Sequence, residues 1–599
     1  MPKNKNVIIK YTSRDFQSIK QDLVDYAQRY YSEGYRDFTE ASFGSMMIDT
    51  VAYIGDTLSY YLDYNVNESF LDTSLEYENV RKHAAALGYN FSGTPSSYGI
   101  VSIFVIVPAN SDGTAPDTSY LPILKTGATF SGGDGGNFIL TQDVNFADAS
   151  ADIVSARFDS TTGATTFFAV RAYGQVQSGT VYLATIDLAG TVFEKFRKVR
   201  VADSNVSEII SVIDSDGRRY YQVDNLAQEV VFVETTNKTA ASDGVRSILK
   251  PFSATRRFTL VQDDTGTYLQ FGFGSEDSTA NGTVDPSAVA LKMHGKNYIT
   301  SKSFDPTRLM STDRLGVSPY NTILKIVYRA NSPATTNIGA NQISSVLNKT
   351  FVFTDPTILV TASRQSVENS IEVNNDKPIT SATNDLSVEE IKVRAKAHYA
   401  TQNRAVTKED YESLVYNMPT QFGAIKRANI LNDPSSTNRR LSLYLISEDN
   451  NGYLAMANDI TKNNVKNWLN RFKSLNDVIE IIDPRVINFG VEFSVVIDQR
   501  FSSDSVVFEC TQALQDYFSE VFYIGEPIYL TKIYDKLNRV DGVDDTRRVI
   551  ISNKTGGAYS GLSLSFDKIL SKDGTFIKTP KNAIMELKFP NLDIKGTAK

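Results

Sequence analysis

The chain has 599 residues, of which 41% are hydrophobic and 22% are charged, and this composition is typical of a folded protein with several domains. Its formal net charge of −8 disfavours direct binding to nucleic acid, because phosphate contacts usually require a basic patch. The only cysteine, Cys510, excludes an intrachain disulfide and a multi-cysteine zinc site, and we expect it to be a buried core thiol. No apolar run is long enough to span a membrane, so we expect no membrane contact.

The first 90 residues are predicted to form three helices. The motif Thr12-x-x-Asp15 is typical of a capping box and begins the first, which should end before Gly34. The second should begin after Phe43-Gly44. The third should begin at Thr73-x-x-Glu76 and end at Gly88, a residue type that commonly caps helix C-termini.

The second predicted helix carries a heptad-like row of apolar residues, whose spacing alternates between four and three. This spacing is typical of a helix that packs lengthwise against another helix. The row consists of Met47, Val51, Ile54, Leu58 and Tyr61.

Tyrosine is concentrated in the same region, which holds eleven of the 31 tyrosines. Tyrosine is enriched at protein interfaces because it combines a large apolar face with a polar tip. Aromatic packing among the three helices is the alternative explanation. Three short helices have little interior, however, so we expect some of these rings, Tyr60 and Tyr61 among them, to contact a partner.

From Ile100 to about Val233, short β-type runs alternate with turns rich in Gly, Asp and Ser, which predicts an antiparallel β domain. The glycine-rich residues 132–136 lack the lysine and the following helix of a phosphate loop. The motif Asp214-x-Asp216-Gly217 lacks the terminal carboxylates of an EF-hand. Both segments are therefore predicted to be turns.

Weaker signals follow from Phe304 to about Asp385. The β-type runs Ile323–Tyr328 and Thr357–Val360 predict a connecting β region with long loops. No repeat of fixed period is evident.

Helical signals return in the last third of the chain, at Ser387-x-x-Glu390 and Thr407-x-x-Asp410, which both resemble capping boxes. The run Ile487–Ile497 has the cleanest period-two alternation of the chain and predicts a strand. Strands with helices packed against them predict small α+β sandwich modules.

The predicted fold class is therefore multidomain α+β, with an N-terminal helical segment, β-rich middle domains and C-terminal α+β sandwich modules. The predicted domains span residues 1–97, 98–245, 246–385 and 386–599.

The sequence lacks a catalytic pattern. The three histidines, His83, His294 and His398, lie in separate predicted regions, and none has a second ligand at metal-binding spacing. There is no P-loop and no nucleophile elbow. We expect no enzymatic activity, no metal and no cofactor.

Several stretches of the sequence, taken in chain order, resemble the motifs of a known protein family. The N-terminal ones are Phe43–Asp49, Tyr60–Asp63, Asn67–Thr73 and Ala86–Tyr89. The downstream ones are Asn403–Glu412 and Lys426–Ala428, with weaker likeness at Phe271–Gly274 and Ile524–Leu530. Together they resemble the baseplate J family, which includes baseplate wedge proteins of T-even-type contractile-tailed phages. Residues 110–240 and 300–380 show little likeness.

The resemblance implies a structural wedge subunit of a contractile tail, located in the virion baseplate and assembled in the host cytoplasm. In such wedges two copies pair and join a helix bundle with a partner, and six wedges close into a ring around a central hub. The implied partners are therefore a second copy, other wedge proteins and the hub, without direct contact to nucleic acid. Residues 13–87 would contact wedge partners, and residues 385–599 would carry contacts between copies.

The candidate interface residues follow from the apolar row, the tyrosines and the resemblance. They are Met47, Val51, Ile54, Leu58, Tyr60, Tyr61, Phe70 and Tyr411. Deletion of residues 1–90 is expected to abolish partner binding while the remainder stays soluble. The linkers near residues 90–98 and 375–386 are candidate hinges.

Three alternatives remain open. The β-rich middle suggests a receptor- or glycan-binding tail protein, and baseplates also contain cell-wall hydrolases. The resemblance to baseplate wedge proteins also fits the equivalent wedge subunit of a related contractile injection system.

Overall fold

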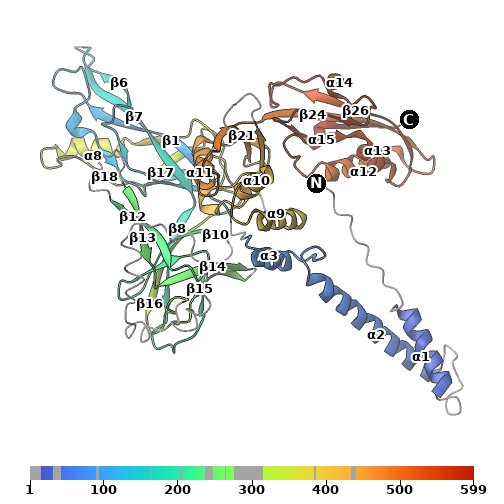
Figure 1. The fold of residues 1–599 in the computed structure, drawn as a ribbon. Coiled ribbons are helices and arrows are strands. Elements are labelled where there is room, and N and C mark those ends of the chain that lie inside the picture. The colour runs from blue at the N-terminus through green and yellow to red at the C-terminus, as the bar shows by residue number, and fades with distance from the viewer. Residues whose placement is uncertain are drawn as a thin grey trace. The chain divides into compact units, whose positions relative to one another are not determined.

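The computed structural model describes residues 15–30, 42–89, 94–161, 163–202, 205–236, 247–263, 265–274, 315–383, 386–432 and 440–598. The predictions at Thr12, Gly34 and His294 lie outside these residues. The chain divides into two compact units (Figure 1). The first comprises residues 1–91 and 386–403, and the second comprises residues 92–385 and 404–599.

The first unit contains the three predicted N-terminal helices, which are confirmed. They are α1 (Phe16–Tyr30), α2 (Phe43–Glu68) and α3 (Tyr77–Ala86). A fourth helix, α9 (Val388–Thr401), comes from far along the chain and begins at the predicted cap Ser387, whose hydroxyl accepts from the amide of Glu390.

The predicted capping box at Thr73 is wrong, because α3 begins at Tyr77 and its N-cap is Glu76. The Thr73 hydroxyl instead donates to the carbonyl of Asn67 in the turn after α2. The predicted end of α3 is confirmed, since Gly88 has φ +88°, a left-handed conformation that a residue with a Cβ adopts only with strain.

Helices α3 and α9 share the hydrophobic core of the first unit. Its fully buried residues are Val80, Ala84, Tyr89, Leu386, Ile391 and Ala395. The buried His398 ring lies beside Tyr89, with ring centroids 6.3 Å apart. The stability of α3 therefore depends on residues some three hundred positions downstream.

The second unit begins with a seven-stranded sheet in the order β17-β3-β4-β7-β1-β19, with β6 paired to β7. Its strands are β1 (Tyr98–Pro108), β3 (Thr129–Gly132), β4 (Asn137–Leu140), β6 (Asp152–Phe158), β7 (Thr165–Ser178), β17 (Ile343–Asn348) and β19 (Glu372–Asn374). A three-stranded sheet accompanies it, formed by β2 (Ile123–Leu124), β5 (Val144–Asn145) and β18 (Phe351–Val352). Helix η1 covers Thr118–Tyr120.

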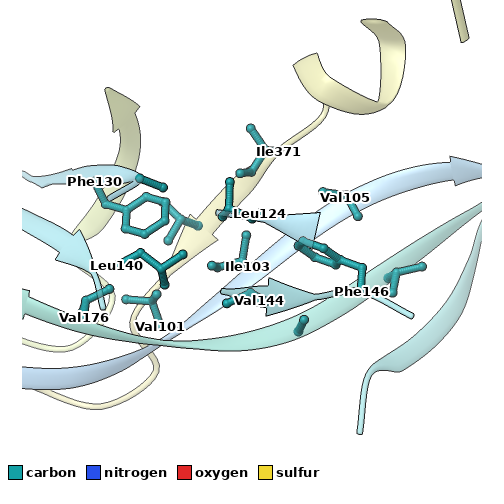
Figure 2. Packing of buried hydrophobic residues seen from close by; sticks show 14 of the residues in the cluster. Val101, Ile103, Val105, Leu124, Phe130, Leu140, Val144, Phe146, Val176 and Ile371 are labelled. Atoms are coloured by element: carbon teal, nitrogen blue, oxygen red, sulfur yellow. The ribbon is translucent and has the colours of Figure 1, made fainter. Parts of the chain in front are cut away.

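The core of this region follows the alternation of β1, whose residues Val101, Ile103 and Val105 are fully buried. Figure 2 shows them packed with Leu124, Phe130 and Leu140 from neighbouring strands. Residues far downstream in the sequence, such as Ile338 and Ile379, belong to the same core.

A second seven-stranded sheet lies in the sequence between β7 and β17, in the order β8-β16-β10-β11-β14-β15-β9. Its strands are β8 (Thr180–Asp187), β9 (Lys198–Ala202), β10 (Val206–Ile213), β11 (Arg219–Gln222), β14 (Arg257–Asp263), β15 (Gly266–Phe271) and β16 (Ile323–Ala330). A separate hairpin pairs β12 (Val230–Thr236) with β13 (Ser247–Ser253). The core of the first sheet is thus completed by chain that follows the second.

Both glycine-containing motifs are turns, as predicted. Residues 132–136 join β3 to β4, and residues 214–217 join β10 to β11. The Asp214 carboxylate accepts from the amides of Asp216 and Arg218, so it organises the turn itself.

The strand predicted at Thr357–Val360 is wrong. The Asp355 carboxylate accepts from the amide of Thr357 and forms a turn, and helix α8 (Thr361–Asn369) follows. Four apolar or β-branched residues in a row resemble a strand, but a side chain that bonds to the backbone two residues on favours a turn.

The remaining chain forms two α+β modules, which confirms the predicted class. The first contains α10 (Lys408–Tyr416), η2 (Thr420–Phe422), β20 (Arg427–Asn432), β21 (Arg440–Glu448), β22 (Leu454–Met456), α11 (Asp459–Leu469) and β23 (Val478–Ile482). The second contains β24 (Arg485–Ile497), α12 (Ser503–Tyr517), β25 (Ile528–Tyr529), α13 (Leu530–Asn538), β26 (Val543–Lys554), α14 (Phe566–Ile569), β27 (Phe576–Ile577), β28 (Ala583–Glu586), α15 (Pro590–Asp593) and β29 (Ile594–Ala598).

Three local predictions for these modules are confirmed. Thr407 and Asp410 form a reciprocal capping box at the start of α10. The period-two run forms β24, and Cys510 is buried in the core beneath it.

Tyr411 anchors the core of the first module. Its ring is 1% exposed, and its hydroxyl donates to the Asp477 carboxylate at 2.6 Å. Asp477 is itself fully buried, so the hydroxyl supplies a hydrogen bond to a carboxylate that water does not reach.

Replacing Tyr411 by Phe should remove this bond and lower the free energy of unfolding of the module by about 1–3 kcal/mol. Trp468, the only tryptophan of the chain, packs against the same core, so its fluorescence during urea denaturation reports this module. The control is Tyr399→Phe, because Tyr399 is exposed. An unchanged midpoint for Tyr411→Phe would show that the hydrogen bond contributes nothing.

Candidate protein-docking surface

The predicted apolar row of α2 lies on the surface. We call Met47, Val51, Ile54, Leu58 and Tyr61 the α2 seam, and each is 48–57% exposed. Single exposed apolar residues are common on proteins, but a contiguous row of this length is typical of an interaction site.

The opposite face of α2 is made of small and polar residues and is covered by α1. Ser45 and Ala52 are buried, and they lie roughly 140–160° around the helix axis from Met47. Ile19 of α1 packs at Gly55, and Lys20 Nζ lies 2.7 Å from a carboxylate oxygen of Asp49. Helix α1 therefore covers the small side chains and leaves the large apolar ones exposed.

A second row, spaced by seven residues, flanks the α2 seam. We call Met46, Tyr53 and Tyr60 the tyrosine stripe, and each is 53–65% exposed. It lies roughly 120° around the helix from the seam. A straight helix packed on one row cannot also cover the other.

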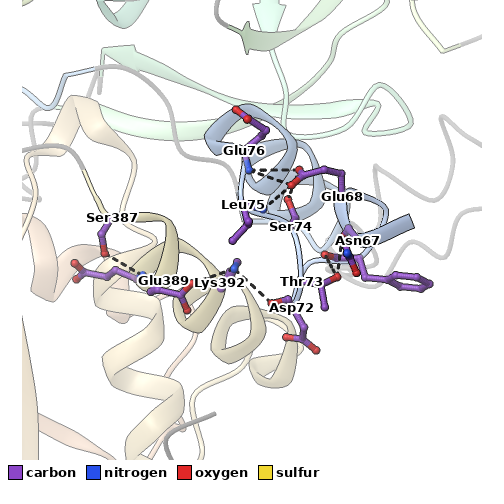
Figure 3. A network of polar contacts seen from close by, with 12 residues as sticks. Asn67, Glu68, Asp72, Thr73, Ser74, Leu75, Glu76, Ser387, Glu389 and Lys392 are labelled. Carbon is purple, nitrogen blue, oxygen red and sulfur yellow. Dashed lines mark hydrogen bonds and ion pairs between the residues drawn. The ribbon is translucent and has the colours of Figure 1, made fainter. Parts of the chain in front are cut away.

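The C-terminal end of α2 is held by a buried carboxylate. Glu68 is 8% exposed and accepts hydrogen bonds from the Leu75 amide at 2.8 Å, the Asn79 side chain at 2.9 Å and the Ser74 hydroxyl at 3.0 Å. The Glu76 amide donates to it at 3.4 Å. Because the N-cap of α3 has no side-chain cap of its own, Glu68 satisfies amides that a helix start otherwise leaves free (Figure 3).

These hydrogen bonds decide the ionisation of Glu68. Burial raises the pKa of the carboxyl, but the bonds from Leu75, Asn79, Ser74 and Glu76 together lower it below its ordinary value of 4.5. Glu68 is therefore a carboxylate at neutral pH, and the negative charge sits at the N-terminus of α3, where the helix dipole favours it.

The turn after α2 is also tied to α9. We call residues 69–76 the elbow. Lys392 Nζ donates to the Asp72 carbonyl at 3.4 Å, and Lys396 pairs with the Asp72 carboxylate. Phe70 and Leu75 on the elbow are 62% and 71% exposed, so the exposed apolar surface continues past the end of α2.

The structure places seven of the eight candidate interface residues on this surface, on α2 and the elbow. Tyr411 is not among them, because its side chain is buried in the first C-terminal module, and it is left out of the surface. Sequence reasoning missed Glu68, Met46 and Leu75. The Glu68 side chain acts on residues six to eleven positions away, beyond the three-residue spacing of a capping motif.

The described residues contain no cluster of His, Cys, Asp and Glu that could hold a metal ion. Of the histidines, the His83 ring bonds to the Glu68 carbonyl at 2.8 Å. Burial lowers the pKa of His398. No helix among the described residues is long and apolar enough to cross a membrane.

Residues 15–86, which include α1, α2 and α3, match the family model of the bacteriophage baseplate protein, N-terminal domain. This match supports a structural baseplate protein located in the tail baseplate of the virion. No curated protein sequence matches the chain.

Two solved baseplate structures are also similar to this chain. One, a cryo-EM structure of the anti-feeding prophage (AFP) baseplate, 6-fold symmetrised, has 11% identity over 96% of this chain and 98% of its own, with a TM-score of 0.25. The other, the type VI secretion system TssK-TssF-TssG baseplate subcomplex, has 8% identity over 74% of this chain and 96% of its own, with a TM-score of 0.23.

The Glu68→Gln variant should loosen the elbow, because a neutral amide accepts weaker hydrogen bonds than a carboxylate. Hydrogen exchange of the amides in residues 69–86 should show lower protection at pH 7. The pKa of Glu68 is lower in the folded than in the unfolded chain. The stabilisation that its carboxylate gives to the elbow is therefore complete above the pKa of the unfolded chain, and it is lost as the pH falls through the pKa of the folded chain. Protection in the wild type should therefore fall on acidification below pH ~4.

The pH dependence distinguishes Glu68 from its neighbours. The elbow of Glu68→Gln should respond to this acidification less than that of the wild type. Glu78→Gln is the control, since Glu78 lies in the first turn of α3 and pairs with Arg81 of the same helix. Equal acid sensitivity in the wild type and in Glu68→Gln would contradict the role of the carboxylate.

Proposed function

We propose that this protein is a structural wedge subunit of a contractile-tail baseplate, of the baseplate J type, and that it docks on partner subunits through the α2 seam and the tyrosine stripe. The observation that carries the proposal is the exposed heptad row of α2. It lies within the segment that matches a baseplate N-terminal domain.

The chemistry of α2 favours a helical partner. A row with alternating spacing of four and three presents knobs to a helix that runs alongside. Four acidic residues and no basic ones occur on α2, and Asp49, Asp56 and Asp63 lie on the side of α1, away from the seam. The seam is thus uncharged, and association through it is expected to depend on apolar burial more than on salt.

The two rows together favour a bundle. The α2 seam fits one further helix, and the tyrosine stripe fits a second, because the rows face different directions. A second copy of this chain and a helix of another wedge protein would fill the two positions. The six-fold ring, the contact with the hub and contacts between copies through residues 404–598 belong to the same proposal.

The proposal is for a non-enzymatic subunit. The packing of His83 and His398 within the first unit supports this assignment, because the His83 ring bonds to the Glu68 carbonyl and the His398 ring packs beside Tyr89. The receptor-binding and hydrolase alternatives are supported by no observation on the described residues.

The Leu58→Asp substitution should break the docking, because a carboxylate in the middle of the seam would have to be desolvated in the bundle. The chain is co-expressed with the other tail structural proteins of its phage, and complexes are sized by light scattering and identified by mass spectrometry. The wild type is expected to form a stable complex with wedge partners, and Leu58→Asp to lose it by at least about a hundredfold in affinity, since ~3 kcal/mol of burial is replaced by desolvation.

Leu592→Asp is the matched control. Leu592 lies on α15 and is 67% exposed, against 57% for Leu58, so it measures the general cost of an exposed Asp. Complexes that survive Leu58→Asp, or that are lost equally in the control, would contradict docking through the seam.

A truncation separates docking from folding. The sequence predicts that the rest of the chain stays soluble when residues 1–90 are deleted. That deletion would, however, remove the α3 side of the α3–α9 core. A chain that begins at Asn67 keeps Glu68, the elbow and α3. It should remain folded by circular dichroism and monodisperse, yet bind no wedge partner; partner binding at wild-type strength would exclude α2 as the docking element.

A further inference from the structure

The first C-terminal module has a strand with a free edge. Strand β23 pairs with β21 in parallel, from Arg440 opposite Val478 to Tyr444 opposite Ile482. Among the described strands it has no partner on its other side. An edge of this kind presents unpaired backbone amides and carbonyls that can pair with an added strand.

A groove of about 530 Å³ follows this edge. Four consecutive residues of β23, 478–481, line it. Because consecutive side chains of a strand point to opposite faces, a groove that touches all four runs along the backbone edge. The groove is therefore placed where an added strand would lie.

The other wall of the groove is one face of α11. Its lining residues there are Asp459, Lys462, Asn463 and Lys466, which are spaced three, four and seven positions apart and so share a face. A free strand edge beside a helix face is an arrangement in which an extended peptide can be captured by strand addition.

The groove is lined by one more positive than negative side chain. The cations are Arg440, Lys462 and Lys466, and the anions are Asp459 and Glu480. Arg440 lies 3.5 Å from Glu480, and Lys462 lies 2.8 Å from Asp483. Lys466 has no acidic side chain within ion-pair distance among the described residues, which leaves it available to a carboxylate of a ligand.

We infer that this groove binds an extended segment of a partner protein that adds to β23 as a strand and places a carboxylate against Lys466. The backbone edge supplies the main-chain hydrogen bonds, and α11 selects for acidic side chains. This site lies on a different element from the α2 seam, so it stands or falls independently of the proposed wedge docking.

The test uses the full chain and a fluorescein-labelled octapeptide of alternating valine and glutamate. The wild type should bind it saturably. Lys466→Glu should weaken binding about tenfold, because one exposed ion pair is lost and a repulsion of similar size replaces it. The same octapeptide with every second amide N-methylated cannot donate hydrogen bonds along one edge, and it should not bind.

Lys536→Glu is the matched control, since Lys466 and Lys536 are both the basic residue in the last turn of a helix, α11 and α13. It should bind the peptide like the wild type. Absence of saturable binding at millimolar peptide, equal binding by Lys466→Glu, or binding of the N-methylated peptide would each overturn the inference.

A second copy of this chain is the remaining candidate occupant. In the Leu58→Asp background, where docking through α2 is disabled, sedimentation should show a monomer. A dimer that disappears on adding Lys466→Glu would assign the groove to self-association and overturn the partner segment.

Discussion

The buried carboxylate of Glu68 is the contact on which the N-terminal unit depends. It is the last residue of α2, and it accepts hydrogen bonds from the Ser74 hydroxyl and from the Leu75 and Glu76 amides that directly precede α3, which fixes the elbow between the two helices. An apolar residue in its place would leave those amides buried without acceptors, at a cost of about 1–3 kcal/mol each. Glu68, together with Lys392 and Lys396 on α9, therefore sets the direction in which the α2 seam leaves α3. A docking surface is useful to an assembly only if its direction is set.

The elbow also explains why α9 belongs to the first unit. Lys392 and Lys396 reach Asp72, and Ile391 and Ala395 bury against α3. The whole β-rich region is thus inserted in sequence between two helices that pack on each other. A chain organised in this way closes its N-terminal unit only after residue 400 has been made, so the docking surface becomes anchored when most of the protein already exists.

The sequence predicted a helix or strand correctly where that element depends on residues close together in the chain. Thr407 and Asp410 lie three positions apart and form the predicted box, and β24 follows its alternation. The errors arise where a partner outside the motif, or a competing turn, determines the local structure. Thr73 does not cap α3, because α3 begins at Tyr77 and the Thr73 hydroxyl bonds to the Asn67 carbonyl. Asp355 forms a turn where Thr357–Val360 suggested a strand.

The same distinction separates the candidate interface residues that lie on the exposed surface from Tyr411, which is buried. Exposure of the α2 seam follows from helical spacing, which is local, whereas Tyr411 is buried in a core and bonds to Asp477, which lies 66 residues away. A tyrosine next to a family-like motif gives no sign of such a partner. Glu68 was missed for the matching reason, since an acid at a helix C-terminus is normally unfavourable and becomes favourable only because a second helix begins beside it.

The two surfaces proposed for partners make different demands. The α2 seam offers side chains with no free backbone, which suits a helix of matching spacing, and the proposed association depends on apolar burial more than on salt. Strand β23, four of whose five residues are apolar, offers its free backbone edge to an extended segment, and Lys466 supplies the selection by charge. Because the surfaces share no residue, binding at one does not require binding at the other. A subunit equipped in this way can be held permanently through α2 while the groove exchanges partners, and the second contact can be made after the first without any rearrangement of the docking helices.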